Sequence, residues 1–162
     1  MTPTPDANPP VPIFRRIVFP PLLVEDFLSM QTHFENVARE LQLIEVGGHL
    51  GEDIPIHVST LTDALRRSRT AMRDEARRQA MVAFHAGQKE FRLDLVLPVP
   101  SHPVVQAMVD LFDQTDLWSE RGVLLTPVAP PGARHVLHAI IEHLEDVQAG
   151  DVPAASPAPS LD

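Results

Sequence analysis

Three histidines and three carboxylates lie close together in the stretch RHVLHAIIEHLED, which spans residues 134–146. If this stretch is a helix, His135, His138 and Glu142 fall on one stripe, because each residue turns the helix by about 100°. Two imidazoles and a carboxylate can bind zinc. No residue elsewhere in the sequence is marked as a fourth ligand or as a partner that would orient these three. We therefore interpret the stripe as the solvent-facing side of a helix, with a metal site as the alternative.

A group of arginines is the second candidate for chemistry. Arg66, Arg69, Arg73 and Arg77 project within about 80° of one another on a second predicted helix. Guanidinium groups bind phosphates and carboxylates, so this face predicts a site for an anion or for an acidic protein surface. The alternative is pairing within the chain, since Glu35 and other acidic residues of the first predicted helix are available. We predict the four arginines as the partner-binding residues.

Motifs of the common enzyme classes are missing from the sequence. There is no phosphate-binding G-x-x-x-x-G-K-[ST] or G-x-G-x-x-G loop and no G-x-S-x-G turn around a nucleophile. The absence of cysteine excludes thiol catalysis and cysteine-ligated zinc. Asp110, Asp113 and Asp116 are spaced by three residues, which fits a carboxylate cluster or, equally well, an exposed acidic stripe on the polar face of a helix. We expect no catalytic residues, no cofactor and no enzymatic activity.

Composition narrows the partners and the compartment. A net charge of −9 over 162 residues argues against general nucleic-acid binding and against binding to anionic membranes. No apolar run approaches the roughly twenty residues that span a bilayer. The first residues, MTPTPDANPPVP, lack the basic and apolar regions of a signal peptide. We expect a cytoplasmic protein. Twelve arginines against one lysine indicate a GC-rich coding bias.

Proline-rich ends frame one predicted domain. Residues 1–12 and 151–162 are expected to be disordered tails, and residues 13–150 a single folded domain. The first helix has apolar residues at alternating spacings of four and three, which predicts lengthwise packing against neighbouring helices. These positions are Leu23, Phe27, Met30, Phe34, Val37, Leu41 and Ile44.

Three further helices are predicted, at about residues 57–85, 102–121 and 131–149. The second has Val58, Leu61, Leu65, Met72, Ala76 and Ala83 on one face. The third directs inward Val104, Met108, Leu111, Phe112 and Thr115, with Trp118 closing the end of the core. The last directs inward Val136, Ile140, Ile141, Leu144 and Val147, with His143 at the rim of the core.

One segment has the period of a strand. In EFRLDLVLPVP, Phe91, Leu93, Leu95 and Leu97 alternate with other residues. A single strand leaves its backbone unpaired, and the two candidate partners are residues 13–19 and 123–128. Extended segments lying across the helices are the alternative. The predicted fold is mainly α: a four-helix bundle with one to three short extended or β segments.

Residues 111–150 also carry a family pattern. An acidic helix end is followed by R-G-x-L-L-T-x-x-A-P-P, from Arg121 to Pro131, and then by a helix with a late Gln-x-Gly at Gln148 and Gly150. This segment resembles a helical module of actinobacterial signalling proteins that accompanies GHKL-type ATPase domains in anti-sigma factors and sensor kinases. The chain has neither the N-box nor the glycine-rich lid of that ATPase domain. The resemblance therefore implies a regulatory or docking role without kinase activity.

These observations favour a non-enzymatic regulatory or adaptor protein that binds a protein partner in bacterial signalling or transcription control. The resemblance suggests a signalling kinase or a sigma-factor regulator as that partner, and a homodimer is a further candidate. The alternatives are a small-molecule or metal sensor using His135, His138 and Glu142, and a self-assembling structural protein whose free strand edge is completed by another copy.

Overall fold

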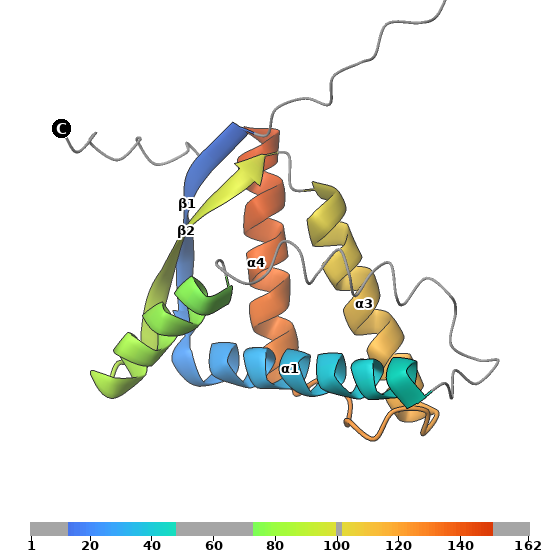
Figure 1. The fold of residues 1–162 in the computed structure, drawn as a ribbon. Helices are drawn as coiled ribbons and strands as arrows, with labels where there is room; N and C mark the ends of the chain where they lie inside the picture. The colour runs from blue at the N-terminus through green and yellow to red at the C-terminus, as the bar shows by residue number, and fades with distance from the viewer. Residues whose placement is uncertain (1–12, 48–72, 100–101, 151–162) are drawn as a thin grey trace, which may run out of the picture.

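The computed structural model describes residues 13–47, 73–99 and 102–150, and Figure 1 shows their arrangement. Strand β1 (Ile13–Leu23) leads directly into helix α1 (Val24–Gly47). A helix is described over residues 73–85 and is followed by strand β2 (Glu90–Val99). Helices α3 (His102–Glu120) and α4 (Pro131–Ala149) complete the order. The predicted terminal tails and residues 48–72, with Val58, Leu61, Leu65 and Met72, lie outside the described residues.

The predicted four-helix bundle is wrong, because the extended segments form a substantial part of the fold. β1 has 11 residues and β2 has 10, and they pair along their lengths as an antiparallel ribbon. The described chain is therefore a mixed α/β arrangement in which the helices pack around a two-stranded sheet. Of the two candidate partners of β2, residues 13–19 are confirmed. Residues 123–128 form no strand.

The pairing register explains how the ribbon accommodates proline. Ile17 lies opposite Leu95 and Val18 opposite Asp94, whereas Leu22 lies opposite Phe91, so β1 has one extra residue between these pairs. This is a β-bulge, with Phe19 and Pro20 facing the single residue Leu93. A proline lacks the N–H that a regular ladder uses, and bulges are among the few places in a sheet that tolerate it.

The core lies between the inner face of the ribbon and the helices. Side chains alternate along each strand, and Ile17, Phe19, Leu93 and Leu97 are buried on the inner face. Figure 1 shows α4 running beside the ribbon, α1 crossing their base and α3 on the far side of α4. The helices contribute most of the remaining main-core residues, which include Phe27, Met30, Ala76, Ala80, Ala83, Phe112, Ala133, Val136, Leu137, Ile141, Leu144 and Val147.

A second, smaller hydrophobic cluster lies farther along α1. Val37 and Leu41 of α1 pack there with Trp118 and Leu124, all nearly fully buried. Trp118 thus closes an end of the core, which confirms its prediction. We call these residues the distal cluster, because they are separate from the main core under the ribbon.

The predicted ends of the helices and most of their predicted buried positions are confirmed where the structure describes them. α3 stops before Gly122 and α4 before Gly150, and both glycines have the positive φ that ends helices. Leu23 is an exception: it ends β1 and is 45% exposed instead of lying in the seam of α1. Ile140 is only half-buried, and Leu137 takes a core position that was not predicted. None of the helices in the described ranges has the length and apolar character needed to cross a membrane.

Candidate functional site

The 73–85 helix presents the candidate binding surface, and small residues fix its orientation. Ala76, Ala80 and Ala83 lie on one side, and all three are buried in the main core, Ala80 completely. Alanine allows the helix backbone to approach the ribbon closely. Because this side is committed to the core, the opposite side must face away from it.

A glutamine fastens this helix to the free edge of β2. The side-chain amide of Gln79 donates to the main-chain carbonyl of Asp94 at 2.7 Å. The main-chain N–H of Asp94 donates back to the Gln79 carbonyl oxygen at 2.9 Å. The amide therefore replaces one residue of a neighbouring strand. The helix and whatever its outer side carries are held firmly against the ribbon.

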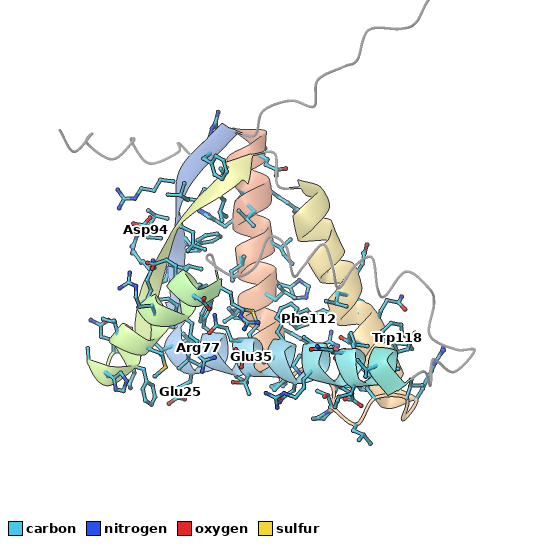
Figure 2. The ribbon with its side chains drawn as sticks, in the orientation of Figure 1. Glu25, Glu35, Arg77, Asp94, Phe112 and Trp118 are labelled. Atoms are coloured by element: carbon cyan, nitrogen blue, oxygen red, sulfur yellow. The ribbon has the colours of Figure 1, made fainter. Side chains whose placement is uncertain are left out.

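Two of the four predicted arginines lie on this helix, and both pair within the chain. Arg77 contacts Glu35 of α1 at 2.7 Å and Arg73 approaches the same oxygen at 3.8 Å (Figure 2). The pairing considered as the alternative is therefore present, yet the two side chains remain 53% and 41% exposed. Arg66 and Arg69 lie outside the described residues.

Apolar residues beside these arginines are exposed, which the sequence analysis missed. Val82 is 59% exposed and Phe84 50% exposed near the end of the same helix. Arg78, whose side chain is 64% exposed, pairs only with Glu75 one turn earlier among its described contacts. Val82 lies one turn after Arg78 and Phe84 two turns after Arg77, so the two apolar residues border opposite sides of the exposed face. We call Arg73, Arg77, Arg78, Val82 and Phe84 the outer surface of the 73–85 helix. The sequence could have indicated this exposure. A helical projection places Val82 and Phe84 outside the arc occupied by Ala76, Ala80 and Ala83 of the buried face.

The histidine stripe of α4 has the character of a solvated face. His135, His138 and Glu142 are all exposed. Within the described residues, no three histidine or acidic side chains are grouped so that they could hold a metal ion. His143 is half-buried, and its ring packs against Phe19 with 5.2 Å between centroids. This confirms its predicted place at the rim of the core.

A row of polar contacts joins α1 to the segment that links α3 with α4. Asp26, His33 and Glu40 are spaced by seven residues and so lie along one stripe of α1. The Asp26 carboxylate lies against Gly132, in the first turn of α4, in the space that a Cβ atom at Gly132 would take. His33 lies near Arg134, and Glu40 binds the loop at Leu125 and Thr126. We call these contacts the α1 clasp.

Glu40 shows why residues 123–128 form a loop instead of a strand. Its carboxylate accepts hydrogen bonds from the main-chain N–H groups of Leu125 and Thr126, the latter at 2.8 Å. It also accepts one from the Thr126 hydroxyl at 2.7 Å. Partial burial raises the pKa of Glu40, but these three hydrogen bonds outweigh it, and the net pKa is below the ordinary value. The loop therefore takes its partners from α1.

Asp116 corrects a further prediction, since it is buried instead of forming part of an exposed acidic stripe. Only 3% of the residue is exposed. One carboxylate oxygen accepts the Ala129 N–H at 2.8 Å, and the other contacts the Arg134 guanidinium. A buried carboxylate needs such partners. Asp116 follows Phe112 by four residues and so lies beside a core residue on the same face of α3. This relation indicated burial, whereas the spacing of three between the aspartates indicated an acidic stripe.

Comparison with known proteins adds no assignment. No protein-family model matches the chain, and neither a curated protein nor a solved structure does.

Proposed function

We propose that this chain is a non-enzymatic regulatory or adaptor protein that binds an acidic protein partner through the outer surface of the 73–85 helix. The observation that carries the proposal is the exposure of Val82 and Phe84 beside three arginines on a helix whose other side is buried. Arginine and aromatic residues are enriched among the residues that contribute most to binding at protein interfaces. The resemblance of residues 111–150 to a signalling module supports a kinase or sigma-factor regulator as the partner.

The distribution of charge supports an acidic partner. Residues 13–23 and 73–99 carry seven basic and four acidic side chains, a net charge of +3. Residues 24–47 and 102–150 carry three basic and twelve acidic side chains, a net charge of −9. The ribbon and the 73–85 helix therefore form the basic side of an acidic protein. Complementary charge steers a negatively charged partner toward this side and repels it from the other helices.

Affinity capture from a lysate of the source organism tests the proposal. Tagged wild-type protein is compared with Arg78→Glu/Phe84→Ser, and retained proteins are quantified by mass spectrometry. Arg78 and Phe84 are chosen because neither is buried, so the fold should survive. A matched control, Arg121→Glu/Leu125→Ser, changes an exposed arginine and a 93% exposed leucine at the opposite end of α1. Circular dichroism verifies that all three proteins are folded.

The expected result is an acidic partner that wild type and control retain equally and that the Arg78/Phe84 variant loses at least about tenfold, or roughly 1.4 kcal/mol. Retention should also fall as the salt concentration rises, because the Debye length shortens to about 3 Å at 1 M salt. Equal retention by both variants would place the interface elsewhere. Recovery of the chain alone would contradict an adaptor role.

A further inference from the structure

A buried histidine stands at the boundary between the main core and the distal cluster. His33 is 6% exposed and lies on α1 between Met30 of the main core and Val37 of the distal cluster. Its ring packs against Phe112 of α3, with centroids 5.6 Å apart. Its Nε2 atom has no hydrogen-bond partner within the part of the chain that the structure describes. An imidazolium carries an N–H on both nitrogens, so the charged form would leave a buried donor unsatisfied.

The charges facing His33 also oppose a second positive charge. From α4, Arg134 lies close enough for its guanidinium to disfavour protonation of the ring. From α3, Asp116 faces the same junction, but its carboxylate is already bound by Arg134 and the Ala129 N–H. On α1 itself, Asp26 and Glu40 lie two helical turns away on either side, and Glu40 is occupied by the 121–130 loop.

The effect on stability has a defined sign. Burial first, and then the charge of Arg134, hold the pKa of His33 below its ordinary value of 6.5. The unfolded chain therefore binds a proton more readily than the folded one. Neutral His33 contributes its full stability above about pH 6.5, and that contribution is lost as the pH falls toward the lower folded pKa.

We propose that His33 is a proton-operated latch: protonation of its imidazole by solvent releases the α3–α4 segment from the distal half of α1, while the main core stays folded. The protonated ring repels Arg134, so the contact that joins α1, α3 and α4 at this level opens. The distal cluster, in which Trp118 packs with Val37 and Leu41, lies just beyond it along α1. The latch is independent of the proposed partner surface, because it lies on the opposite side of α1 from Glu35.

Trp118 provides the readout, since it is the only tryptophan and is 5% exposed in the distal cluster. Figure 2 places it near the C-terminal end of α1, away from the ribbon. Its fluorescence is followed from pH 8 to pH 4 together with far-UV circular dichroism. The expected result is a red shift with a midpoint below pH 6.5 that precedes the loss of helical signal. A single midpoint for both signals would overturn the latch.

His33→Gln is the decisive variant, because glutamine is polar but does not titrate. It should abolish the early red shift, whereas His138→Gln, which removes an exposed histidine of α4, should leave the shift unchanged. An early red shift that persists in His33→Gln would assign it to another group and overturn the proposal.

Wild-type protein gives a second test that does not depend on the variant folding. The ring protons of the histidines are titrated by NMR. One ring with a pKa below 6.5 should titrate in step with the Trp118 shift, and its resonance should be missing from His33→Gln or, if that variant is unfolded, from His33→Asn. If no histidine titrates in step with the Trp118 shift, the latch is excluded.

Discussion

At the scale of single residues, the first turn of α4 contains a glycine that is matched to its neighbour instead of to its own backbone. Gly132 has an ordinary helical backbone, whereas the glycines with positive φ are Gly87, Gly122 and Gly150. The end of the Asp26 side chain occupies the space that a Cβ atom would take, so an alanine here would make that carboxylate turn aside. The carboxylate in turn lies at a helix N-terminus, where the helix dipole favours negative charge.

Gly132→Ala should therefore displace the Asp26 carboxylate, which offsets part of the roughly 1 kcal/mol by which alanine favours a helix over glycine. Moving the carboxylate away from the helix N-terminus is expected to cost about 0.3–1 kcal/mol, so the net change in stability should be small. In the background of Asp26→Ala the space is free, and the same substitution should become stabilising. Urea unfolding of the two single variants and the double variant, followed by far-UV circular dichroism, measures this coupling. Equal effects of Gly132→Ala in both backgrounds would show that Asp26 does not restrict position 132.

Sequence patterns predicted residues of the core better than the polar residues that bind the 121–134 segment, for a physical reason. Burial repeats with the helix period, so Phe27, Val37 and Leu41 could be assigned from their spacing. Asp116 and Glu40 are polar, and a helix pattern assigns polar residues to its wet side. Only the tertiary structure reveals that the 121–134 segment passes there and offers N–H groups and an arginine to those carboxylates.

At the scale of elements, the ribbon was underestimated because its two strands are far apart in sequence. The period-two pattern of β2 was evident, but pairing over more than 60 intervening residues leaves no local signal of register. Residues 20–21 of β1 are both proline, which normally argues against a strand. The bulge accommodates Pro20, and Pro21 lies directly after it opposite Arg92, so β1 continues to Leu23 and the described part of the chain becomes a mixed α/β fold.

The edge of β2 depends on the 73–85 helix, and Gln79 is the residue that tests this dependence. The Asp94 N–H points to Gln79 and therefore away from β1. In an antiparallel ladder the pair types alternate, so the next pair, Leu95 with Ile17, is a hydrogen-bonded pair. Gln79→Ala should cost about 1–2 kcal/mol, since it leaves two partly buried main-chain groups without partners. Hydrogen exchange should accelerate at the Asp94 amide and stay slow at the Leu95 amide.

Gln79→Glu serves as a second variant for this element: it keeps an acceptor for the Asp94 N–H but places a carboxylate against the Asp94 carbonyl and against Glu75, to which the Gln79 amide also donates. Because these oxygens repel one another, protection of the Asp94 amide at neutral pH should fall close to the level of Gln79→Ala. Unchanged exchange in Gln79→Ala would mean that Ala76, Ala80 and Ala83 hold the helix on the ribbon without help from this amide.

At the scale of the whole molecule, the described core is divided between two clusters of unequal size that share α1 and α3. The main core contains twenty buried residues and the distal cluster four. Regions with few buried apolar contacts open at lower free energy than the rest of a domain. The two clusters are connected at the level of His33, Phe112 and Arg134, so this junction determines how strongly the opening of one affects the other.

The distal cluster should therefore open before the main core under native conditions at neutral pH. Amide hydrogen exchange followed by mass spectrometry should show faster exchange in peptides covering residues 37–44 and 117–124 than in peptides covering residues 133–147 of α4. Trp118→Ala removes the largest residue of the small cluster, and it should increase exchange in the first two regions while leaving α4 nearly unchanged. If exchange in α4 accelerates equally, the two clusters unfold as one unit. The junction at His33 would then not allow the distal cluster to open independently of the main core.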